Sequence, residues 1–518
     1  MPHALRAAPW IACAALAACG GAGSSSMGNS ADPGTGNSGM PPSAASPQRG
    51  QLLSDSEVGS YAASDLLPLL GASTPGKELL QLAYTPICLV NVYHIEYETV
   101  GGQGEPATAS GALMVPSGLS SSCRGSRPIV LYAHGTSTDR SYNIASFATT
   151  SNDEGLLLAA VFAAEGYIVV APNYAGYDTS SLDYHPYLNA DQQSKDMIDA
   201  LTAARAALPV PLSPLVSDDH KLFITGYSQG GHVAMATHRA MQAAGMTVTA
   251  SAPMSGPYAL AAFGDAVFMG DVNGGAVINF VLIASSYQRA YGNLYSATTD
   301  IFAPQYALGI DSLLPSTALR STLYAEGKLP ENAVFSSTPP APQYASITPS
   351  TMPANLAPVF ALGFGPSYLV INPYRLAYLQ DAAANPDGGF PNTTTGVPAT
   401  APANTLRQAF KTNDLRNWSP SAPVLLCAGD GDPTVFYLNT QLLQGYWAAN
   451  PPAAPVTVLD VDSAVAAGDP YATLKQAFAA AKAAVALTQG QTGLLEAYHT
   501  ALVPPFCLSA VKSFSDSH

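Results

Sequence analysis

The chain has 518 residues, of which 47% are apolar and only 11% are Asp, Glu, Lys or Arg. A typical soluble domain carries about 25% charged residues, and disordered chains combine low hydrophobicity with high net charge, so most of this chain must fold around a large core. Its 35 acidic and 20 basic residues give a net charge of −15 and include no run of basic residues. Nucleic acid is excluded as an expected partner, because phosphate binding needs clustered positive charge.

The N-terminus has the features of an export signal. Arg6 precedes an apolar run over residues 7–18, which is shorter than the ~20 residues that a bilayer-spanning helix needs. The segment Leu16-Ala17-Ala18-Cys19 resembles a bacterial lipobox, in which the cysteine is lipidated, so we expect residues 1–19 to be a lipoprotein signal peptide with Cys19 as the anchor. An ordinary cleaved signal is the alternative. Either reading predicts an exported protein, anchored to the outer membrane or secreted.

Residues 20–50 are rich in Gly, Ser and Pro, which predicts a flexible linker. Beyond the signal, no stretch reaches 18 consecutive apolar residues, so the membrane contact that we expect is the lipid anchor alone.

An even number of cysteines follows Cys19, which permits two disulfides in an exported protein. We favour Cys88 with Cys123 and Cys427 with Cys507, because each pair flanks segments that we expect to be neighbours. Buried free thiols are the alternative.

From residue 92 onward, short β-branched runs alternate with Ala-rich helical runs, which predicts a mostly parallel sheet flanked by helices. The expected strands are 92–100 and 111–116, which we read as antiparallel, and then 129–134, 167–172, 221–226, 246–254, 424–428 and 456–461. The expected helices are 155–165, 191–208, 230–244, 436–449 and one after Pro504.

The alternation stops over residues 256–422, a stretch too long for a structureless loop. Helical spacing at 278–295 and 368–381 predicts a mainly helical cap inserted after the sixth strand. We expect Tyr287, Tyr291 and Tyr295, on one helix face, to be ordinary core, and a ligand-binding wall is the alternative. Residues 51–255 and 423–518 then form the two parts of the sheet domain.

The strongest local motif is Gly226-Tyr227-Ser228-Gln229-Gly230, which lies between a predicted strand and a predicted helix. A Gly-x-Ser-x-Gly turn in this context projects the serine as a nucleophile, whereas a simple glycine-rich turn is the alternative. The backbone N–H of Gln229 opens the helix and can donate to an oxyanion. A second donor is expected from Thr136 N–H in the loop after the strand 129–134. We expect His134 in that loop to be structural rather than a base.

A serine nucleophile needs a base, and the base needs an orienting carboxylate. In chains with this turn the acid and then the histidine follow the serine, which favours His499, since the other late histidine, His518, lies at the terminus. Asp432 in Gly429-Asp430-Gly431-Asp432-Pro433 follows the strand 424–428 and is the favoured acid. Three other aspartates remain alternatives: Asp430, Asp460 and Asp462. We expect His232 and His238, on the helix after Ser228, to be packing or surface residues.

Together these residues resemble the α/β-hydrolase superfamily, and within it the bacterial relatives of secretory lipases. The likeness extends over roughly residues 79–514 and includes three further stretches: 171–178, His185-Pro186-Tyr187-Leu188 and 499–507. Asn173 and Tyr177 depart from the residues common in that group. The resemblance implies ester hydrolysis through an acyl-serine, with a cap that shapes the acyl site.

We therefore expect a serine carboxylesterase or lipase that acts on a small-molecule or lipid ester without a metal or organic cofactor. The low charge of the chain favours uncharged, hydrophobic esters and would suit lipid degradation. Two alternatives stay open: a serine peptidase of the same fold, and a noncatalytic surface lipoprotein on a hydrolase scaffold. The sequence does not indicate an oligomeric state.

Overall fold

The computed structural model describes residues 48–82, 86–147, 153–391 and 395–518. The signal peptide, Cys19 and most of the predicted linker lie outside the described residues. Arg49 and Gly50, which the prediction assigns to the end of the linker, are part of the folded body. The Arg49 guanidinium donates to both carboxylate oxygens of Asp199 at 3.0 Å, and Gly50 N–H donates to Glu98 O at 2.7 Å. These contacts place residues 49 and 50 in the folded body, two residues before the start at residue 51 that the sequence predicts.

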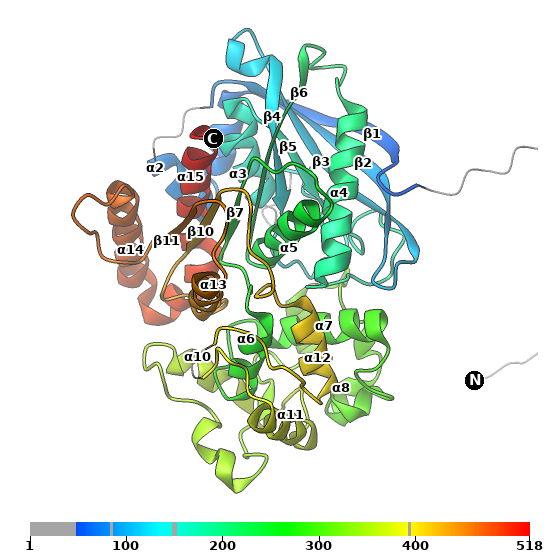
Figure 1. The fold of residues 1–518 in the computed structure, drawn as a ribbon, viewed down its shortest axis with the longest axis vertical. Helices are drawn as coiled ribbons and strands as arrows, with labels where there is room; N and C mark the ends of the chain where they lie inside the picture. The colour runs from blue at the N-terminus through cyan, green and yellow to red at the C-terminus, as the bar shows by residue number, and fades with distance from the viewer. Residues whose placement is uncertain (1–47, 83–85, 148–152, 392–394) are drawn as a thin grey trace, which may run out of the picture. The chain divides into compact units, whose positions relative to one another are not determined.

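The centre of the fold is a nine-stranded sheet in the order β1-β2-β3-β5-β4-β6-β7-β10-β11 (Figure 1). The pairs β1–β2, β2–β3 and β3–β5 are antiparallel, and the other pairs in this sheet are parallel. The strands are β1 Leu52–Tyr61, β2 Leu89–Val100, β3 Pro106–Ser117, β4 Gly125–Ala133, β5 Ile168–Pro172, β6 Val216–Tyr227, β7 Ala250–Met254, β10 Val424–Ala428 and β11 Val456–Asp460. The mostly parallel sheet predicted from the sequence is confirmed.

Strand β1 has no counterpart in the prediction. Most of its side chains are exposed, so its sequence lacks the apolar alternation that marks a half-buried strand. Because β1 precedes the expected strands, the cap follows the seventh strand of the observed sheet, which is the sixth strand of the predicted series.

Helices cover both faces of the sheet. Side chains of α4, α5 and α13 pack on one face, and those of α1, α2, α3 and α15 pack on the other, together with part of α14. These helices are α1 Ala63–Leu70, α2 Thr74–Gln81, α3 Asp153–Val161, α4 Ala190–Ala207, α5 Gln229–Ala243, α13 Leu438–Ala449, α14 Ala472–Ala497 and α15 Val503–Asp516. With both faces covered, the parallel strands are buried on both sides, which explains their continuous apolar sequences.

The chain between β7 and β10 forms a mainly helical region with its own apolar core, and it lies at the lower end of the view in Figure 1. Its helices are α6 Leu260–Phe268, α7 Ala276–Tyr291, α8 Pro304–Ala307, α9 Arg320–Ala325, α10 Ala357–Leu362, α11 Asn372–Ala384 and α12 Thr405–Asn413, and a two-stranded pair joins β8 Phe335–Ser336 to β9 Phe364–Gly365. We call residues 256–422 the cap.

The prediction of one aromatic face over 278–295 was wrong at its end. Helix α7 ends at Tyr291, where Gly292 adopts a left-handed conformation with φ 69°, so Tyr295 lies beyond the helix. Tyr287 is buried in the cap core and donates to Leu188 O at 3.1 Å.

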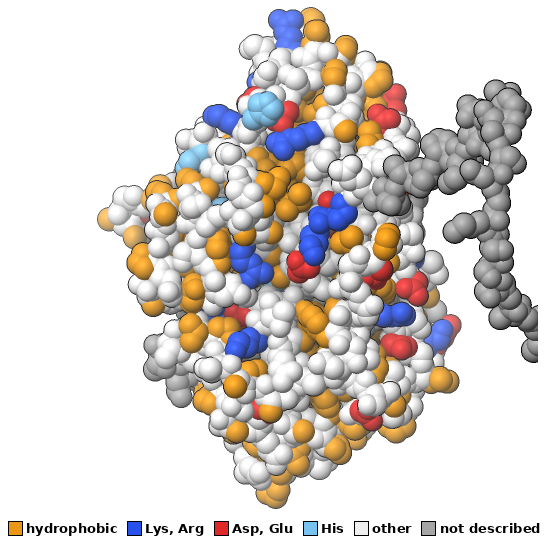
Figure 2. All heavy atoms as spheres, turned by 45° about the vertical axis from the view of Figure 1, so that its right-hand side comes forward, with side chains coloured by type: hydrophobic (Ala, Val, Ile, Leu, Met, Phe, Trp, Pro, Cys, Tyr) orange, Lys and Arg blue, Asp and Glu red, His pale blue; other side chains and the backbone are white. Residues whose placement is uncertain are grey.

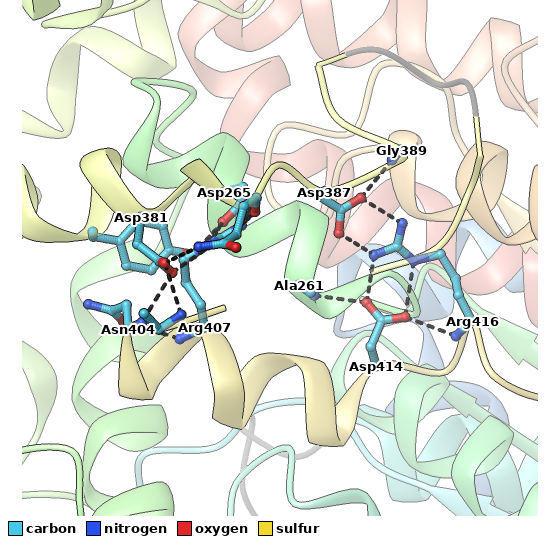
Figure 3. A network of polar contacts seen from close by, with 12 residues as sticks. Ala261, Asp265, Asp381, Asp387, Gly389, Asn404, Arg407, Asp414 and Arg416 are labelled. Atoms are coloured by element: carbon cyan, nitrogen blue, oxygen red, sulfur yellow. Dashed lines mark hydrogen bonds and ion pairs between the residues drawn. The ribbon is translucent and has the colours of Figure 1, made fainter. Parts of the chain in front are cut away.

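Two buried arginines bind the elements of the cap together (Figure 3). Arg407 of α12 contacts Asp265 of α6 and Asp381 of α11, each at 2.8 Å. Arg416 lies between Asp387 and Asp414, at 2.8 and 2.9 Å, and none of these three side chains is exposed. Charge buried in this way must be fully paired, so the two clusters fix how the cap segments cross.

Disulfides join Cys88 to Cys123 and Cys427 to Cys507, which is the pairing favoured from the sequence. The second disulfide connects β10 to α15. One helical run in the described part of the chain, 472–516, is long and apolar enough to cross a membrane by length and composition, but most of its apolar window is buried in the fold. We therefore read it as core. On the face shown in Figure 2, charged side chains lie singly or in small groups among uncharged ones.

Candidate active site

Ser228 stands at the sharp turn between β6 and α5, with φ 59° and ψ −120°. Such a conformation costs free energy for a side chain larger than glycine and is typical of functional turns. The two flanking glycines are required by space, because a Cβ at Gly226 or Gly230 would collide with the carbonyl oxygen of Ala133. The turn therefore presents Ser228 at the carboxyl end of the sheet.

His499, Asp432 and Ser228 form one hydrogen-bonded chain. His499 Nδ1 lies 2.6 Å from Asp432 Oδ2, and His499 Nε2 lies 2.8 Å from Ser228 Oγ. An ionised carboxylate only accepts hydrogen bonds, so the imidazole proton belongs on Nδ1 and Nε2 accepts from the serine hydroxyl. This is the arrangement that nucleophilic catalysis by serine needs.

Each member of this chain is held by its own element. Asp432 follows β10, and its Oδ1 accepts from Thr434 N–H at 2.8 Å and Val435 N–H at 3.0 Å. His499 lies in a π-helical turn between α14 and α15, where its carbonyl accepts from Tyr227 OH at 2.6 Å. The Cys427–Cys507 disulfide joins β10, which precedes Asp432, to α15, which follows the turn of His499. It therefore fixes the acid and the histidine relative to each other.

The alternative acids have other partners. Asp430 is exposed, and its N–H donates to Asp460 Oδ1 at 3.1 Å. Asp462 pairs with Lys482 at 2.6 Å. The geometry thus brings Asp432, and not these aspartates, to His499.

Three other histidines near the turn are buried and bonded elsewhere. Burial lowers the pKa of His134, His232 and His238 to about 4, which keeps each imidazole neutral at pH 7. His134 Nε2 lies 3.0 Å from Asn173 O, as expected of a structural residue. His232 Nε2 lies 2.8 Å from Asn413 O, and His238 Nδ1 lies 2.7 Å from Ser251 Oγ.

Both expected oxyanion donors border the same cavity as Ser228 and His499. Gln229 is the first residue of α5, and the first N–H groups of a helix have no intrahelical acceptor. Gly135 N–H already donates to both oxygens of Glu154, at 3.1 and 3.2 Å, so the next N–H, that of Thr136, remains the candidate donor from this loop. Sequence reasoning assigned no role to Glu154, whose position at a helix start carries no motif.

The cavity has a volume of about 1050 Å³ and lies between the sheet domain and the cap. Most of its lining is apolar, and about half of the lining residues come from the cap, including Leu260, Phe263, Val267, Phe268, Ile278, Phe280, Ile283, Val359 and Phe410. Four charged residues, Glu154, Arg320, Glu331 and Glu496, also border it. A site of this size and lining suits an apolar small molecule. In the described part of the chain, no group of three or more His, Cys, Asp or Glu side chains is placed to hold a metal ion.

A sequence profile of the prolyl oligopeptidase family matches residues 157–271, a minority of the chain that includes Ser228. No curated protein sequence matches the chain significantly. A variant of the rice cell wall degrading esterase LipA from Xanthomonas oryzae is 25% identical, with a TM-score of 0.65 over 90% of this chain and 98% of LipA. A ligand-bound form of LipA gives 25% identity and a TM-score of 0.61, covering 88% and 98% of the two chains.

A Legionella pneumophila protein described as a hydrolase is 19% identical, with a TM-score of 0.61, covering 90% of this chain and 98% of that protein. At this identity the likeness shows the fold alone. Taken together, the similarities show that the chain is an esterase-like protein with the α/β-hydrolase fold.

Proposed function

We propose that this protein is a serine carboxylic-ester hydrolase that acts through an acyl-serine intermediate on uncharged, hydrophobic esters. The observation that carries the proposal is the hydrogen-bonded chain Ser228–His499–Asp432, which ends in a cavity with mostly apolar walls. The description of LipA as an esterase supports the ester as the substrate class.

The proposed reaction follows from the positions of these groups. His499 Nε2 takes the Ser228 proton as Oγ attacks the ester carbonyl carbon, and Asp432 stabilises the imidazolium that forms. The N–H groups of Gln229 and Thr136 bind the oxyanion. His499 then gives the proton to the departing alcohol. Water attacks the acyl-serine with His499 again as base, which releases the acid and restores Ser228.

The test is turnover of p-nitrophenyl esters from acetate to palmitate by the wild-type protein and by Ser228→Ala. We expect the variant to fold normally and to lose activity to near background. Ser217→Ala, at an exposed position on β6, is the matched control and retains wild-type turnover. Unchanged activity in Ser228→Ala would refute the proposal, and a fluorophosphonate that fails to label Ser228 would favour the noncatalytic scaffold.

A serine peptidase is the second candidate, favoured by the match to the prolyl oligopeptidase family. The same Ser228 chemistry would cleave an amide. Turnover of an ester and of the corresponding aminoacyl amide, measured side by side, separates the two: faster amide turnover would favour the peptidase.

We also propose that the protein is exported and anchored through Cys19. The two disulfides support an oxidising compartment, where such bonds persist. Metabolic labelling with a radioactive fatty acid tests the anchor: label in the wild-type chain and none in Cys19→Ala is expected, and an unlabelled wild-type chain would leave a secreted protein instead.

A further inference from the structure

The loop over residues 173–189, between β5 and α4, has an unusual backbone. Tyr174, Asp178 and Leu188 have φ values of 66°, 50° and 52°, in the left-handed region that non-glycine residues rarely adopt. Such conformations persist only where the surroundings impose them, and they cluster at functional sites. Most of the loop is buried, so its side chains contact the protein rather than solvent.

One set of contacts holds the loop that carries Thr136. Tyr174 OH donates to His134 O at 3.0 Å, and Tyr177 OH donates to Ser137 O at 2.6 Å. Between these two points, Tyr187 OH lies 2.8 Å from Thr136 Oγ1. Three tyrosines of the 173–189 loop therefore fix consecutive parts of the 134–137 loop.

A second set of contacts holds the residue after the nucleophile. His185 Nδ1 lies 2.8 Å from Ala175 O, and His185 Nε2 lies 2.7 Å from the side-chain nitrogen of Gln229. Burial lowers the pKa of His185 to about 3, so the imidazole is neutral and carries one proton. That proton must lie on Nδ1, because Ala175 O only accepts, and Nε2 then accepts from Gln229 Nε2–H.

We infer that the 173–189 loop sets the spacing of the two oxyanion donors, with His185 and Tyr187 as positioning residues. The inference rests on the proposed function. Thr136 and Gln229 belong to segments that are far apart in the sequence, yet both N–H groups must lie 2.7–3.1 Å from one oxyanion to stabilise it. The loop touches both segments and connects them through a rigid, buried backbone. We call the contacts of His185 and Tyr187 with these two segments the clamp. Tyr187 OH also donates to Asn279 Oδ1 of α7 at 3.4 Å, which connects the clamp to the cap.

The test compares Tyr187→Phe and His185→Phe with Tyr184→Phe. Tyr184 lies in the same loop, but its hydroxyl bonds Gly102 N–H at 2.8 Å and Glu105 Oε1 at 2.6 Å, so it is the matched control. Rates are measured on p-nitrophenyl acetate per active site, titrated by burst, so that unfolded protein does not contribute. Affinity is also measured for a trifluoromethyl ketone, which adds Ser228 Oγ and places an oxyanion between the donors.

For both clamp variants we expect kcat to fall roughly tenfold to a hundredfold, with KM within about twofold, because misplaced donors stabilise the transition state less. The affinity for the ketone falls by the same factor as kcat/KM, and Tyr184→Phe matches the wild type. A purely structural role would lower the thermal midpoint and leave these constants unchanged. If His185→Phe does not fold, Tyr187→Phe, which removes one hydroxyl, decides alone.

A double-mutant cycle adds a check on the Tyr187 contact. Thr136→Val removes the hydroxyl that faces Tyr187, whereas Thr136→Ser retains it. We expect Thr136→Val with Tyr187→Phe to be no slower than either single variant, since both remove one interaction, and Thr136→Ser to keep most of the activity. Additive losses, or clamp variants with wild-type kcat, would overturn the inference. Loss of the proposed function is distinguishable, because then the wild-type protein has no activity that Ser228→Ala removes.

Discussion

The sheet domain and the cap differ in what their most deeply buried charged side chains contact. In the sheet domain, the buried Asp432 carboxylate belongs to a chain of hydrogen bonds that ends at the half-buried hydroxyl of Ser228. In the cap, Arg407 and Arg416 are each enclosed by two aspartates and lie outside the cavity lining (Figure 3). Among the described residues, three of the chain's 20 basic residues, Arg375, Arg407 and Arg416, are buried, and we assign them to structure because none of them borders the cavity. Buried charge therefore serves both chemistry and structure in the sheet domain, where Asp199 also pairs with Arg49, and structure in the cap.

Asp432→Asn gives the largest expected effect and tests whether the buried Asp432 carboxylate orients His499 for catalysis. The amide can leave His499 in the wrong tautomer, so we expect kcat on a short ester to fall by roughly 10⁴ while the fold is retained. Asp430→Asn, at an exposed position two residues earlier, is the control and keeps full activity. A small loss in Asp432→Asn together with a large loss in Asp430→Asn would reassign the acid.

Arg416→Met tests whether the buried ion pairs of the cap stabilise the fold. The substitution keeps the length of the side chain but leaves Asp387 and Asp414 buried without their cation, which costs about 3–5 kcal/mol of unfolding free energy. Urea unfolding with the disulfides intact measures this loss, and Arg124→Met, at an exposed position, provides the reference. We expect kcat per titrated active site to change little. A stability equal to that of Arg124→Met would show that the cap does not depend on this cluster.

The two regions also differ in how much the sequence predicts. Parallel strands such as β5 and β10 are buried on both faces, so short apolar runs mark them, and the glycine motif at Ser228 and the chain order of Asp432 and His499 follow from local rules. Strand β1 and helix α14 escaped prediction. The first is largely exposed, and the second is an Ala-rich run broken at Gly490, which has non-helical φ and ψ.

The cap was predictable only as a helical insertion. Its helix ends depend on single residues such as Gly292, and the partners of Arg407 lie 26 and 142 residues away in the chain. The contacts of the 173–189 loop are equally distant in sequence, so no spacing rule identifies them. His185 and Tyr187 stood out only as part of a family resemblance, and their contacts come from the tertiary structure.

The two regions also differ in the groups that titrate near neutral pH, because residues 256–422 contain no histidine. The buried His238 of α5 has its pKa lowered from 6.5 to about 4 by burial. The unfolded chain binds this proton below pH 6.5 and the folded chain does not, so stability is present above pH 6.5 and is lost as the pH falls toward 4. For one such histidine the full effect is about 3 kcal/mol. His238→Gln should flatten this acid loss in urea unfolding at pH 7.5, 6 and 5.

Asp271 of the cap contributes the opposite slope. Burial raises the pKa of Asp271 from 3.8 to about 6, so its contribution to stability is present at low pH and is lost as the pH rises through 6. Asp271→Asn should therefore stabilise the protein at pH 8 relative to pH 5. An unchanged pH profile in both His238→Gln and Asp271→Asn would mean that neither side chain titrates as its burial requires.

The smallest expected effect concerns the cavity wall that the cap provides. Val359 of α10 is half-buried and lines the cavity, so Val359→Trp fills part of the space with an indole ring. If acyl chains extend along this wall, kcat/KM should fall about tenfold for the palmitate ester and little for the acetate, which is the size of discrimination that one pocket contact provides. Leu308→Trp, at a cap position that is 98% exposed, leaves the series unchanged. Equal losses on acetate and palmitate would place the acyl chain elsewhere and restrict the role of the cap at Val359 to excluding water from Ser228.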